Sequence, residues 1–342
     1  MNLLVTGGAG FIGSNFIHHW LKNHSDSKIV NFDKLTYAGN LENLKEVENN
    51  PAYTFIKGDI CDSELVVKTI KDNKIDTIVH FAAETHVDRS LMGAKEFLRT
   101  NVEGTYALLE AARDLEISRF HHISTDEVFG AINEGENWKF TESTPYKPRN
   151  PYSASKAASD HQVRAFYESF NLPITITNCS NNYGPYLFPE KLISLAITNL
   201  IEGKKVPIYG KGLQSRDWLY VTDHCKAIDL VLQKGKIGET YCVGGMHTEV
   251  TNKDVVNKLC SIMGKDFDDN TEYVRDRLGH DFKYVVDFSK IEKELGWSPT
   301  VELDEGLEKT VKWYQDNETW WRRVKNKEYQ NYYKEQYKGR AA

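Results

Sequence analysis

The first third of the chain alternates short apolar runs with longer segments of helical spacing, and this alternation constrains the fold more than any other feature. The apolar runs lie at 3–5, 29–32, 54–56, 77–82 and 120–124. Short runs without a polar face are typical of parallel strands, because crossover helices cover both faces of such a sheet. The pattern predicts a βαβ series and therefore an α/β fold with a doubly wound parallel sheet of the Rossmann type.

The regular alternation stops near residue 180. A predicted helix at 152–170 and an apolar strand at 174–179 complete it, and a loop rich in Asn, Gly and Pro follows. Irregular segments beside a rigid sheet commonly carry specificity. We therefore expect a nucleotide-binding domain at 1–180 and, at 181–342, mainly a smaller C-terminal mixed α/β substrate lobe with a helical, aromatic-rich tail. Residues from about 215 to 245 are expected to return to the first domain.

Composition narrows the classes of protein. The 342 residues carry a formal net charge of -6, which gives no general attraction to nucleic acid or anionic lipid. No apolar run reaches the roughly 18 residues that a membrane span requires. The five cysteines include no CxxC pair and the histidines no HExxH motif, so neither a disulfide framework nor a metal site is predicted. We expect a cytoplasmic protein that binds no metal, nucleic acid or membrane.

Three glycines make the start of the chain a candidate dinucleotide site. Gly7, Gly10 and Gly13 follow the first predicted strand and open a predicted helix. Without side chains there, the backbone can approach a pyrophosphate, whose charge then lies at the helix N-terminus. The alternative is a plain turn. Asp33, which ends the second predicted strand, favours the dinucleotide, because a carboxylate there accepts both ribose hydroxyls and repels a 2′-phosphate. The sequence therefore predicts NAD rather than NADP.

Two further charged residues follow predicted strands near this turn. Lys34 is adjacent to Asp33 and, as a cation, weakens the preference for NAD over NADP. Asp59 follows the third predicted strand and can reach the adenine edge of a nucleotide. A role for Asp59 as the cap of a turn or helix fits its position nearly as well.

A Tyr-x-x-x-Lys pair is the first candidate for catalysis. Tyr152 and Lys156 are four residues apart in a predicted helix, so both side chains lie on one face. An ammonium beside a phenol lowers the pKa of the phenol and makes it a base for a hydroxyl proton. Tyr53 and Lys57 share the spacing, but in a predicted strand they would lie about 13 Å apart. We expect the Tyr152 pair to be catalytic rather than a surface pair.

An acidic pair follows the predicted strand at 120–124. Thr125, Asp126 and Glu127 stand at its carboxyl end, where ligands of doubly wound sheets bind. Two neighbouring carboxyls in a partly dry cleft repel, so one tends to keep a proton while the other is ionised. This suits acid and base steps in one site. The alternative is a solvated turn or a cap, and the position of the pair favours catalysis.

Motifs along nearly the whole chain resemble one family, the extended short-chain dehydrogenases/reductases (the NAD-dependent epimerase/dehydratase superfamily), and within it most closely the dTDP-glucose 4,6-dehydratases. The motifs are TGGAGFIG at 6–13, AAETHVDRS at 82–90, STDEVFG at 124–130, YSASK at 152–156, NNYGPYLFPEKLI at 181–193, RDWLYVTDH at 216–224 and RLGHD at 277–281. The glycine and Tyr-Lys motifs are shared by the epimerases and decarboxylases of the superfamily. The Asp126–Glu127 pair distinguishes the dehydratases.

The resemblance implies the dehydration of dTDP-glucose to its 4-keto-6-deoxy product, by oxidation at C4, loss of water across C5/C6 and return of hydride to C6. Thr125 and Tyr152 would contact O4, Asp126 would be the acid, Glu127 the base, and Lys156 would hold the cofactor ribose. The resemblance also implies a homodimer. Two departures stand next to motif residues: Leu278 replaces a usual Pro, and Phe129 a usual Tyr.

The resemblance also assigns binding residues. Those expected at NAD are Gly7, Gly10, Phe11, Ile12, Gly13, Asp33, Lys34, Thr36, Asp59, Ile60, Ala82, Ala83, Thr85, Thr100, Tyr152, Lys156 and Asn181. Those expected at the nucleotide sugar are Glu84, His86, Asp88, Thr125, Asn181, Lys191, Leu192, Arg216, Asn252, Arg277 and His280. For Arg216 and Arg277 the guanidinium geometry suits a diphosphate, and otherwise they would be surface cations.

Alternative functions remain open from the sequence. One is another NAD-dependent nucleotide-sugar enzyme: a UDP-sugar 4-epimerase, a decarboxylase, or a dehydratase with a different nucleotide. Another is a nucleotide-binding protein without catalysis, whose mark would be the loss of Tyr152, Lys156, Asp126 or Glu127, and all are present. No residue spacing here distinguishes thymine from uracil.

Overall fold

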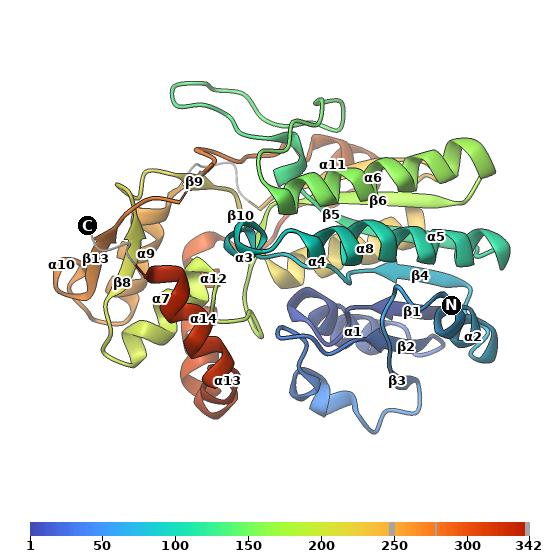
Figure 1. Ribbon diagram of the computed structural model, residues 1–342, viewed down its shortest axis with the longest axis horizontal. Coiled ribbons are helices and arrows are strands. Elements are labelled where there is room, and N and C mark those ends of the chain that lie inside the picture. The colour runs from blue at the N-terminus through green and yellow to red at the C-terminus, as the bar shows by residue number, and fades with distance from the viewer. Residues whose placement is uncertain (246–249, 278, 339–342) are drawn as a thin grey trace.

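A seven-stranded parallel sheet forms the centre of the computed structural model, which describes residues 1–245, 250–277 and 279–338 (Figure 1). Leu278 lies outside the described residues. The strands, in spatial order, are β11 (Thr240–Val243), β6 (Ile174–Cys179), β5 (Arg119–Thr125), β4 (Thr77–His80), β1 (Asn2–Thr6), β2 (Lys28–Asp33) and β3 (Tyr53–Lys57). Every neighbouring pair runs parallel, which confirms the predicted doubly wound sheet.

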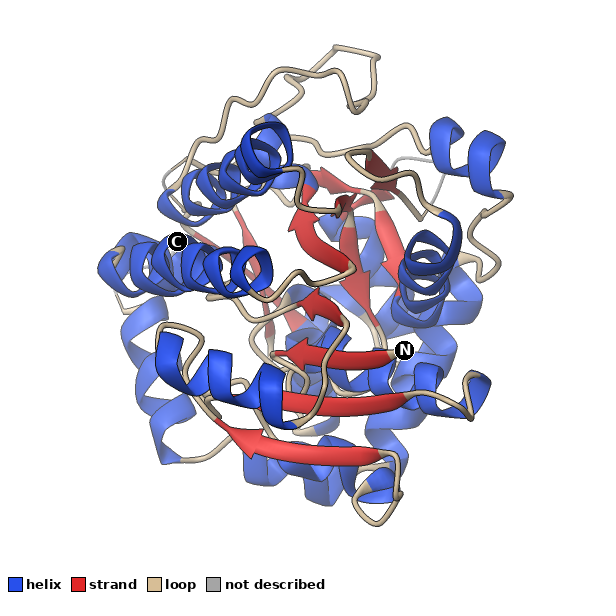
Figure 2. Cartoon of the chain, turned by 90° about the vertical axis from the view of Figure 1, so that its right-hand side faces the viewer, coloured by secondary structure: helices blue, strands red, loops and turns tan. Residues whose placement is uncertain are grey.

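Helices cover both faces of this sheet, as Figure 2 shows. Alternate residues of a strand point to opposite faces. Leu3 and Val5 accordingly pack with α1 (Phe11–Asn23) and α8 (Val221–Lys234), whereas Leu4 packs with helices of the other face. Those helices are α2 (Ser63–Asp72), α5 (Thr105–Asp114) and α6 (Pro151–Phe170). Since both strand faces are apolar, the sheet is buried on both sides.

Local sequence defines the start and the end of α6, the helix of the Tyr-Lys pair. The Asn150 side chain accepts the Ser153 amide in a capping box, and Pro151 takes the first helical position. The helix ends at Asn171, which adopts a left-handed conformation with φ of 55°. The predicted helix at 152–170 is therefore confirmed within a residue. The predicted strand at 77–82 is too long: β4 ends at His80, and the chain continues into the loop that lines the pocket described below.

A second region packs against the carboxyl edge of the sheet (Figure 1). Its two-stranded sheets are β7 (Asn181–Tyr183) with β10 (Trp218–Tyr220), β8 (Val206–Tyr209) with β13 (Thr271–Val274), and β9 (Ser215–Arg216) with β12 (Val250–Thr251). Its helices are α7 (Leu192–Ile201), α9 (Asn252–Ile262), α10 (Phe267–Asn270), α12 (Leu303–Asp316), α13 (Glu318–Val324) and α14 (Lys327–Tyr337). An aromatic core includes Tyr183, Trp218 and Trp321. The Trp320 indole donates to Asn43 at 2.9 Å and so joins the tail to the first region.

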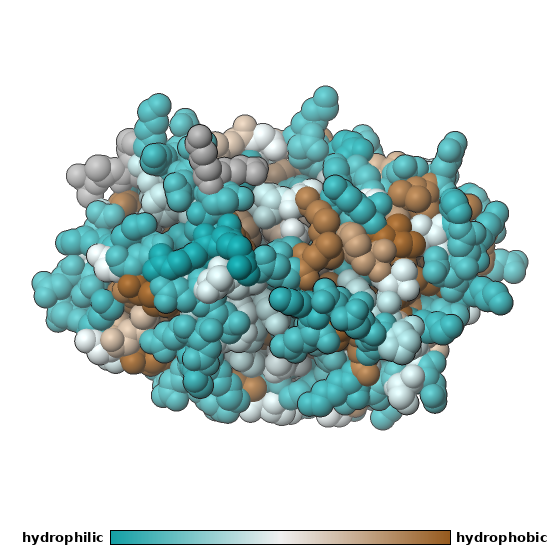
Figure 3. Space-filling model, turned by 90° about the horizontal axis from the view of Figure 1, so that it is seen from below, coloured by the Kyte–Doolittle hydropathy of each residue, from teal (hydrophilic) through white to brown (hydrophobic). Residues whose placement is uncertain are grey.

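The remaining elements are short connectors. They are η1 (Leu41–Val47), α3 (Val87–Met92), α4 (Lys95–Phe97), η2 (Leu98–Gly104), η3 (Asp126–Phe129) and α11 (Ser289–Leu295). The surface in Figure 3 is mainly hydrophilic, with separate apolar patches between polar groups. Among the described residues, no helix has the length and apolar character to span a bilayer.

Candidate active site

One pocket between the sheet and the second region collects the predicted site residues. All residues expected at NAD or at the nucleotide sugar line it. Thr125, Glu127, Tyr152 and Lys156 line it as well, whereas Asp126 is not among the lining residues. Parallel strands end at one edge of a doubly wound sheet, so groups far apart in the sequence meet there.

The turn between β1 and α1 leaves no room for side chains. Gly7 has φ of +69°, and a Cβ on it would lie 2.6 Å from the Ala82 amide nitrogen. A Cβ on Gly13 would lie 2.4 Å from the Gly7 carbonyl oxygen. Gly10 donates its amide to that same carbonyl at 3.1 Å, so the turn closes on itself. The bare backbone and the start of α1 together form a cradle that fits a dinucleotide pyrophosphate.

Asp33 lies at the end of β2 beside this cradle. Its carboxylate accepts the Ala9 amide at 2.9 Å and the Leu35 amide at 2.8 Å. Burial raises the pKa of Asp33, and the two amides oppose that rise. The side chain is thereby fixed while its remaining lone pairs are available to ribose hydroxyls. The residues present therefore fit NAD.

Lys34 and Asp59 pair with one another on the same rim. Lys34 lies 3.0 Å from the Asp59 carboxylate and Arg99 lies 2.8 Å from it. Burial opposes the ionisation of Asp59, but the Cys61 amide and the two cations outweigh it and lower its pKa to about 2. The ammonium of Lys34 is thus paired with Asp59, so Lys34 is a weaker partner for a 2′-phosphate. The bond to Cys61 fits the alternative that Asp59 caps a turn, although Asp59 also lines the pocket.

The predicted lowering of the Tyr152 pKa is wrong for this structure. Burial, together with the nearby charge of Glu127, raises the pKa of the Tyr152 phenol well above its ordinary value. Lys156 directs its ammonium to the Ile123 carbonyl at 2.8 Å, and burial lowers its pKa to about 8. Both side chains nevertheless lie on one face of α6 and line the same pocket, as predicted.

The acidic pair forms the short helix η3 at the end of β5. The Thr125 hydroxyl accepts the Glu127 amide at 3.3 Å and lies 3.4 Å from the Asp126 carboxyl. Burial raises the pKa of Asp126 well above its usual range, and Glu127 reinforces that rise. Burial also raises the pKa of Glu127, but Lys191, Arg277 and Arg216 oppose it. Asp126 is therefore the better proton holder of the two.

Three cations enter the pocket from the second region. Lys191 precedes α7 and donates to the Thr85 carbonyl at 3.1 Å. Arg216 donates to backbone carbonyls, one of them that of Asp281 at 3.0 Å. Arg277 lies 3.5 Å from Asp88, with 17% of its side chain exposed. The alternative that the two arginines are surface cations is wrong.

Several polar atoms of the lining are buried without a hydrogen-bond partner among the described residues. They are the side-chain oxygens of Asn181 and Asn252, one Glu127 oxygen and the Arg277 Nε. Such atoms cost free energy unless they are paired. They mark the pocket as a binding surface for a polar molecule. In the described part of the chain, no group of three or more His, Cys, Asp or Glu side chains is arranged to hold a metal ion.

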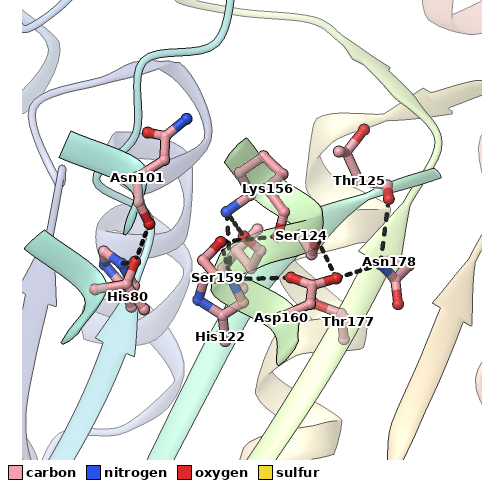
Figure 4. A network of polar contacts seen from close by, with 12 residues as sticks. His80, Asn101, His122, Ser124, Thr125, Lys156, Ser159, Asp160, Thr177 and Asn178 are labelled. Atoms are coloured by element: carbon pink, nitrogen blue, oxygen red, sulfur yellow. Dashed lines mark hydrogen bonds and ion pairs between the residues drawn. The ribbon is translucent and has the colours of Figure 1, made fainter. Parts of the chain in front are cut away.

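The sequence reasoning missed part of the wall. Tyr209, Trp218 and Tyr284 line the pocket, and so do Gln336 and Tyr337 from α14. The tail residues carried no signal, because only the packing of α14 brings them to the pocket. Behind Lys156 the reasoning also missed a polar network centred on Asp160 (Figure 4). Here a signal existed: Asp160 follows Lys156 by four residues in the same helix.

Comparisons with known proteins agree with this geometry. Residues 4–310 match the GDP-mannose 4,6 dehydratase family. A dTDP-glucose 4,6-dehydratase of Neisseria meningitidis is 50% identical, over 96% of this chain and 97% of its own. The crystal structure of a dTDP-glucose 4,6-dehydratase from Streptomyces venezuelae with NAD and TYD bound has a TM-score of 0.91 and 46% identity, and the match covers 95% of this chain and 100% of that one. The chain belongs to the dTDP-glucose 4,6-dehydratase family.

The epimerases of the same superfamily are more distant. A UDP-glucuronic acid 4-epimerase of Bacillus cereus, solved with UDP-glucuronic acid and NAD, has a TM-score of 0.85 and 30% identity, over 92% of this chain and 99% of its own. The fold alone therefore does not separate the two groups. This chain carries Asp126 and Glu127, the acidic pair by which the motif resemblance distinguishes the dehydratases.

Proposed function

We propose that this chain converts dTDP-glucose to dTDP-4-keto-6-deoxyglucose. The observation that carries this proposal is the arrangement of three groups around one pocket: the glycine cradle, the Tyr152–Lys156 pair and the Asp126–Glu127 pair. A Tyr-Lys pair beside a nicotinamide site can serve the oxidation of a hydroxyl, and a neighbouring acid and base can serve the elimination that follows. Relatives similar over almost their whole length bear the same activity in their names.

The cofactor is NAD, held by the cradle of Gly7, Gly10 and Gly13 and by Asp33. When bound, it takes a hydride from C4 of the sugar and returns it at C6. The chain contributes binding, orientation and proton transfer.

Tyr152 takes up the proton of the O4 hydroxyl during the oxidation. Because burial raises its pKa, this phenol requires cationic neighbours to act as a base. Lys156 lines the same pocket one helical turn away. Thr125, which lines the pocket together with Tyr152, helps to hold O4 in line with the phenol.

Glu127 removes the proton from C5. The ketone formed at C4 acidifies this C–H bond, so the oxidation must precede the elimination. The raised pKa of Glu127 makes it a stronger base than a solvated carboxylate, while the three cations of the second region keep it ionised. The same carboxyl gives the proton back to C5 when hydride reaches C6.

Asp126 protonates the departing C6 hydroxyl, which is a poor leaving group as hydroxide. Its pKa is raised strongly, so it holds the required proton. Since Asp126 is buried and is not among the lining residues, we propose that substrate brings its carboxyl into the pocket by a side-chain rotation. The proton balance then requires that Asp126 regain one proton in each turnover while Tyr152 loses the one from O4. Thr125 lies 3.4 Å from the Asp126 carboxyl and lines the pocket with Tyr152, so its hydroxyl offers the route between them.

Lys191, Arg216 and Arg277 hold the diphosphate of the substrate. Two guanidinium groups and an ammonium provide charge-assisted hydrogen bonds to phosphate oxygens. Glu84, His86, Asp88, Leu192, Asn252 and His280 complete the nucleotide-sugar side of the pocket in this proposal. The lining atoms without a protein partner at Asn252 and Arg277 support it.

We also propose the domain division, the compartment and the assembly. Residues 1–180 form the NAD-binding domain, and residues 181–342 form mainly the substrate lobe. Residues from about 215 to 245 belong to the NAD-binding domain, because β11 pairs with β6 of the central sheet. Five free cysteine thiols suit the reducing cytoplasm. Leu91, Met92, Leu98 and Tyr106 are exposed beside α5 and suit an apolar interface of a homodimer.

A mass measurement tests the function directly. The purified protein is incubated with dTDP-, UDP-, GDP- and ADP-glucose, and the products are weighed. The proposal predicts a product lighter by one water from dTDP-glucose, formed without added NAD. Unchanged mass with an inverted C4 centre would identify an epimerase, and conversion of another nucleotide sugar in preference to dTDP-glucose would contradict the substrate.

A further inference from the structure

A fully buried carboxylate lies directly behind the active-site lysine. Asp160 stands one turn after Lys156 in α6, and none of its surface is exposed. It accepts the Ser124 and Tyr146 hydroxyls, both at 2.8 Å, and the Asn178 amide at 3.2 Å, all on one oxygen. Figure 4 shows Ser124 from β5 and Asn178 from β6 beside the Asp160 carboxylate of α6.

His122 connects the other oxygen of Asp160 to Lys156. Its Nε2 lies 3.2 Å from the carboxylate and 3.4 Å from the Lys156 ammonium. A single imidazole nitrogen either donates or accepts, so it bonds to one of these partners at a time. Burial lowers the pKa of His122 to about 4, and the ring is therefore neutral. When Nε2 accepts from Lys156, the ring lies between the ammonium and the carboxylate without a hydrogen bond to that Asp160 oxygen, which has no hydrogen-bond partner among the described residues.

The charge of Lys156 requires such support. A buried ammonium is costly unless it is paired. Its direct protein acceptor is the neutral Ile123 carbonyl at 2.8 Å. Of the carboxylates, Asp160 raises the pKa of Lys156 most and opposes the effect of burial. The carboxylate itself stays ionised, since burial raises its pKa but His122, Lys156 and Ser124 lower it further.

The other titratable groups around Lys156 do not replace Asp160. Tyr152 precedes it by one turn of α6, and Cys179 approaches from β6 with a pKa raised to about 12 by burial. His80 faces it from β4, and burial lowers the pKa of that ring well below its ordinary value. Cys179 and His80 are therefore uncharged near neutral pH, and Tyr152 is an anion only in the state that takes up the O4 proton. Glu127 has its own cationic partners in the second region.

We propose that Asp160 is a positioning residue for the oxidation at C4: across the ring of His122, its carboxylate keeps Lys156 charged and in place beside Tyr152. The ammonium has three N–H donors, of which the Ile123 carbonyl and His122 take two. The third remains for a ligand in the pocket. This inference rests on the proposed function, because it assigns the charge of Lys156 to that reaction.

The first test compares Asp160→Asn with Tyr146→Phe. Asparagine keeps the size and an accepting oxygen but removes the charge, whereas Tyr146→Phe removes one hydrogen bond to the same carboxylate and leaves the charge in place. The rate of formation of bound NADH is followed by rapid-mixing absorbance from pH 6 to 10, with protiated and C4-deuterated dTDP-glucose. The KM for dTDP-glucose is measured in parallel.

Because Lys156 acts as a cation with a pKa of about 8, the rate falls as pH rises through that value. In Asp160→Asn this fall should move to lower pH by about one to three units, the shift that one nearby opposite charge produces. The deuterium isotope effect should increase, and KM should stay within about twofold because the diphosphate cations are untouched. Tyr146→Phe should keep the wild-type profile. A folded Asp160→Asn protein with the wild-type profile and isotope effect would overturn the inference, as would an equal shift in Tyr146→Phe.

A stability cycle adds a readout that is independent of turnover. Melting temperatures are measured for the NAD-loaded wild type, Lys156→Met, Asp160→Asn and the double variant. If Asp160 serves the charge of Lys156, Asp160→Asn should lower Tm less in the Lys156→Met background than in the wild type. Equal losses in both backgrounds, including failure of both to fold, would contradict the inference. Wild-type protein that yields no dehydrated product would instead overturn the proposed function.

Discussion

The two halves of the pocket present different surfaces to their ligands. On the sheet side, the surface is backbone: at Gly7 and Gly13 the turn approaches its neighbours so closely that no side chain fits, and one carboxylate stands beside it. On the lobe side, the surface consists of long charged side chains, among them Lys191 and Arg277.

This difference separates two ways of placing a polar ligand. The backbone cradle depends on contacts between near neighbours in the chain, and its shape is fixed by sterics. The cations depend on the packing of distant segments, and each is held by a backbone carbonyl or a single carboxylate, as Lys191 is held by the Thr85 carbonyl. The catalytic carboxyls lie where the two halves meet. Changes there should stop chemistry, and changes in either half should weaken binding.

The largest effect is expected from Glu127→Gln at the junction. Loss of the base should lower the overall turnover by about 10⁴-fold, the upper range for one general base. Oxidation should persist because Tyr152 and Lys156 are intact, so bound NADH and an undehydrated 4-keto sugar should accumulate. Absorbance and mass spectrometry of the quenched mixture measure both. The exposed Glu136→Gln is the control, and a Glu127→Gln enzyme without bound NADH would contradict this assignment.

Asp126→Asn should separate the acid from the base. With dTDP-glucose the turnover should fall by about 10²–10³-fold, because hydroxide leaves poorly without a proton. With dTDP-6-fluoroglucose, whose fluoride leaves with little help, the variant should approach the wild-type rate. Glu127→Gln should not be rescued by fluoride. An equal response of both variants to the fluoro substrate would show that the division of roles is wrong.

On the lobe side, Arg277→Met should raise KM more than it lowers kcat. The loss of charge-assisted hydrogen bonds to a diphosphate costs about 1.5–3 kcal/mol, or roughly 10- to 100-fold in KM. Arg275→Met makes the same chemical change at an exposed position two residues away and should leave KM near the wild-type value. Initial-rate kinetics measure both. Equal KM values for the two variants would remove Arg277 from the substrate side.

On the sheet side, Asp33→Ser should have the smallest of these effects. NAD binding should weaken by roughly tenfold, because the ribose hydroxyls lose a charged acceptor. NADP should gain relative to NAD, since a repulsive charge next to its 2′-phosphate is removed. Calorimetric titration of the protein freed of nucleotide measures both affinities. An unchanged NAD:NADP ratio would show that Asp33 does not select the cofactor.

The same contrast explains how much could be predicted from the sequence. Hydrophobic periodicity and motif spacing are properties of short stretches of chain. The strands, the helix of Tyr152 and the glycine turn could therefore be predicted from them. The motif resemblance then supplied the lobe residues, which spacing alone does not connect. Tyr337 and Gln336 could not be predicted, because only the packing of α14 against the lobe brings them to the pocket.

Electrostatics were harder to predict than positions. The spacing of Tyr152 and Lys156 predicted a shared face, which is correct, and a lowered phenol pKa, which is wrong here. The reason is burial: it penalises the phenolate, and the Lys156 ammonium bonds to the Ile123 carbonyl instead. The carboxylate that we propose to support that ammonium, Asp160, is visible in the sequence as a Lys-x-x-x-Asp spacing. Its meaning depends on the depth at which α6 is buried.

A deuterium label at C4 tests whether one bound NAD carries the hydride from C4 to C6 within a single turnover. dTDP-glucose with deuterium at C4 and ¹²C in the sugar is mixed with dTDP-glucose that has no deuterium and carries ¹³C in the sugar. The products are analysed by mass spectrometry and NMR. If the hydride stays on one bound cofactor, we expect each product to have lost one water. Deuterium should be found at C6 of the ¹²C product alone, with none in solvent or in free NADH. Deuterium in the ¹³C product, its loss to solvent, or a need for fresh NAD at every turnover would contradict the account.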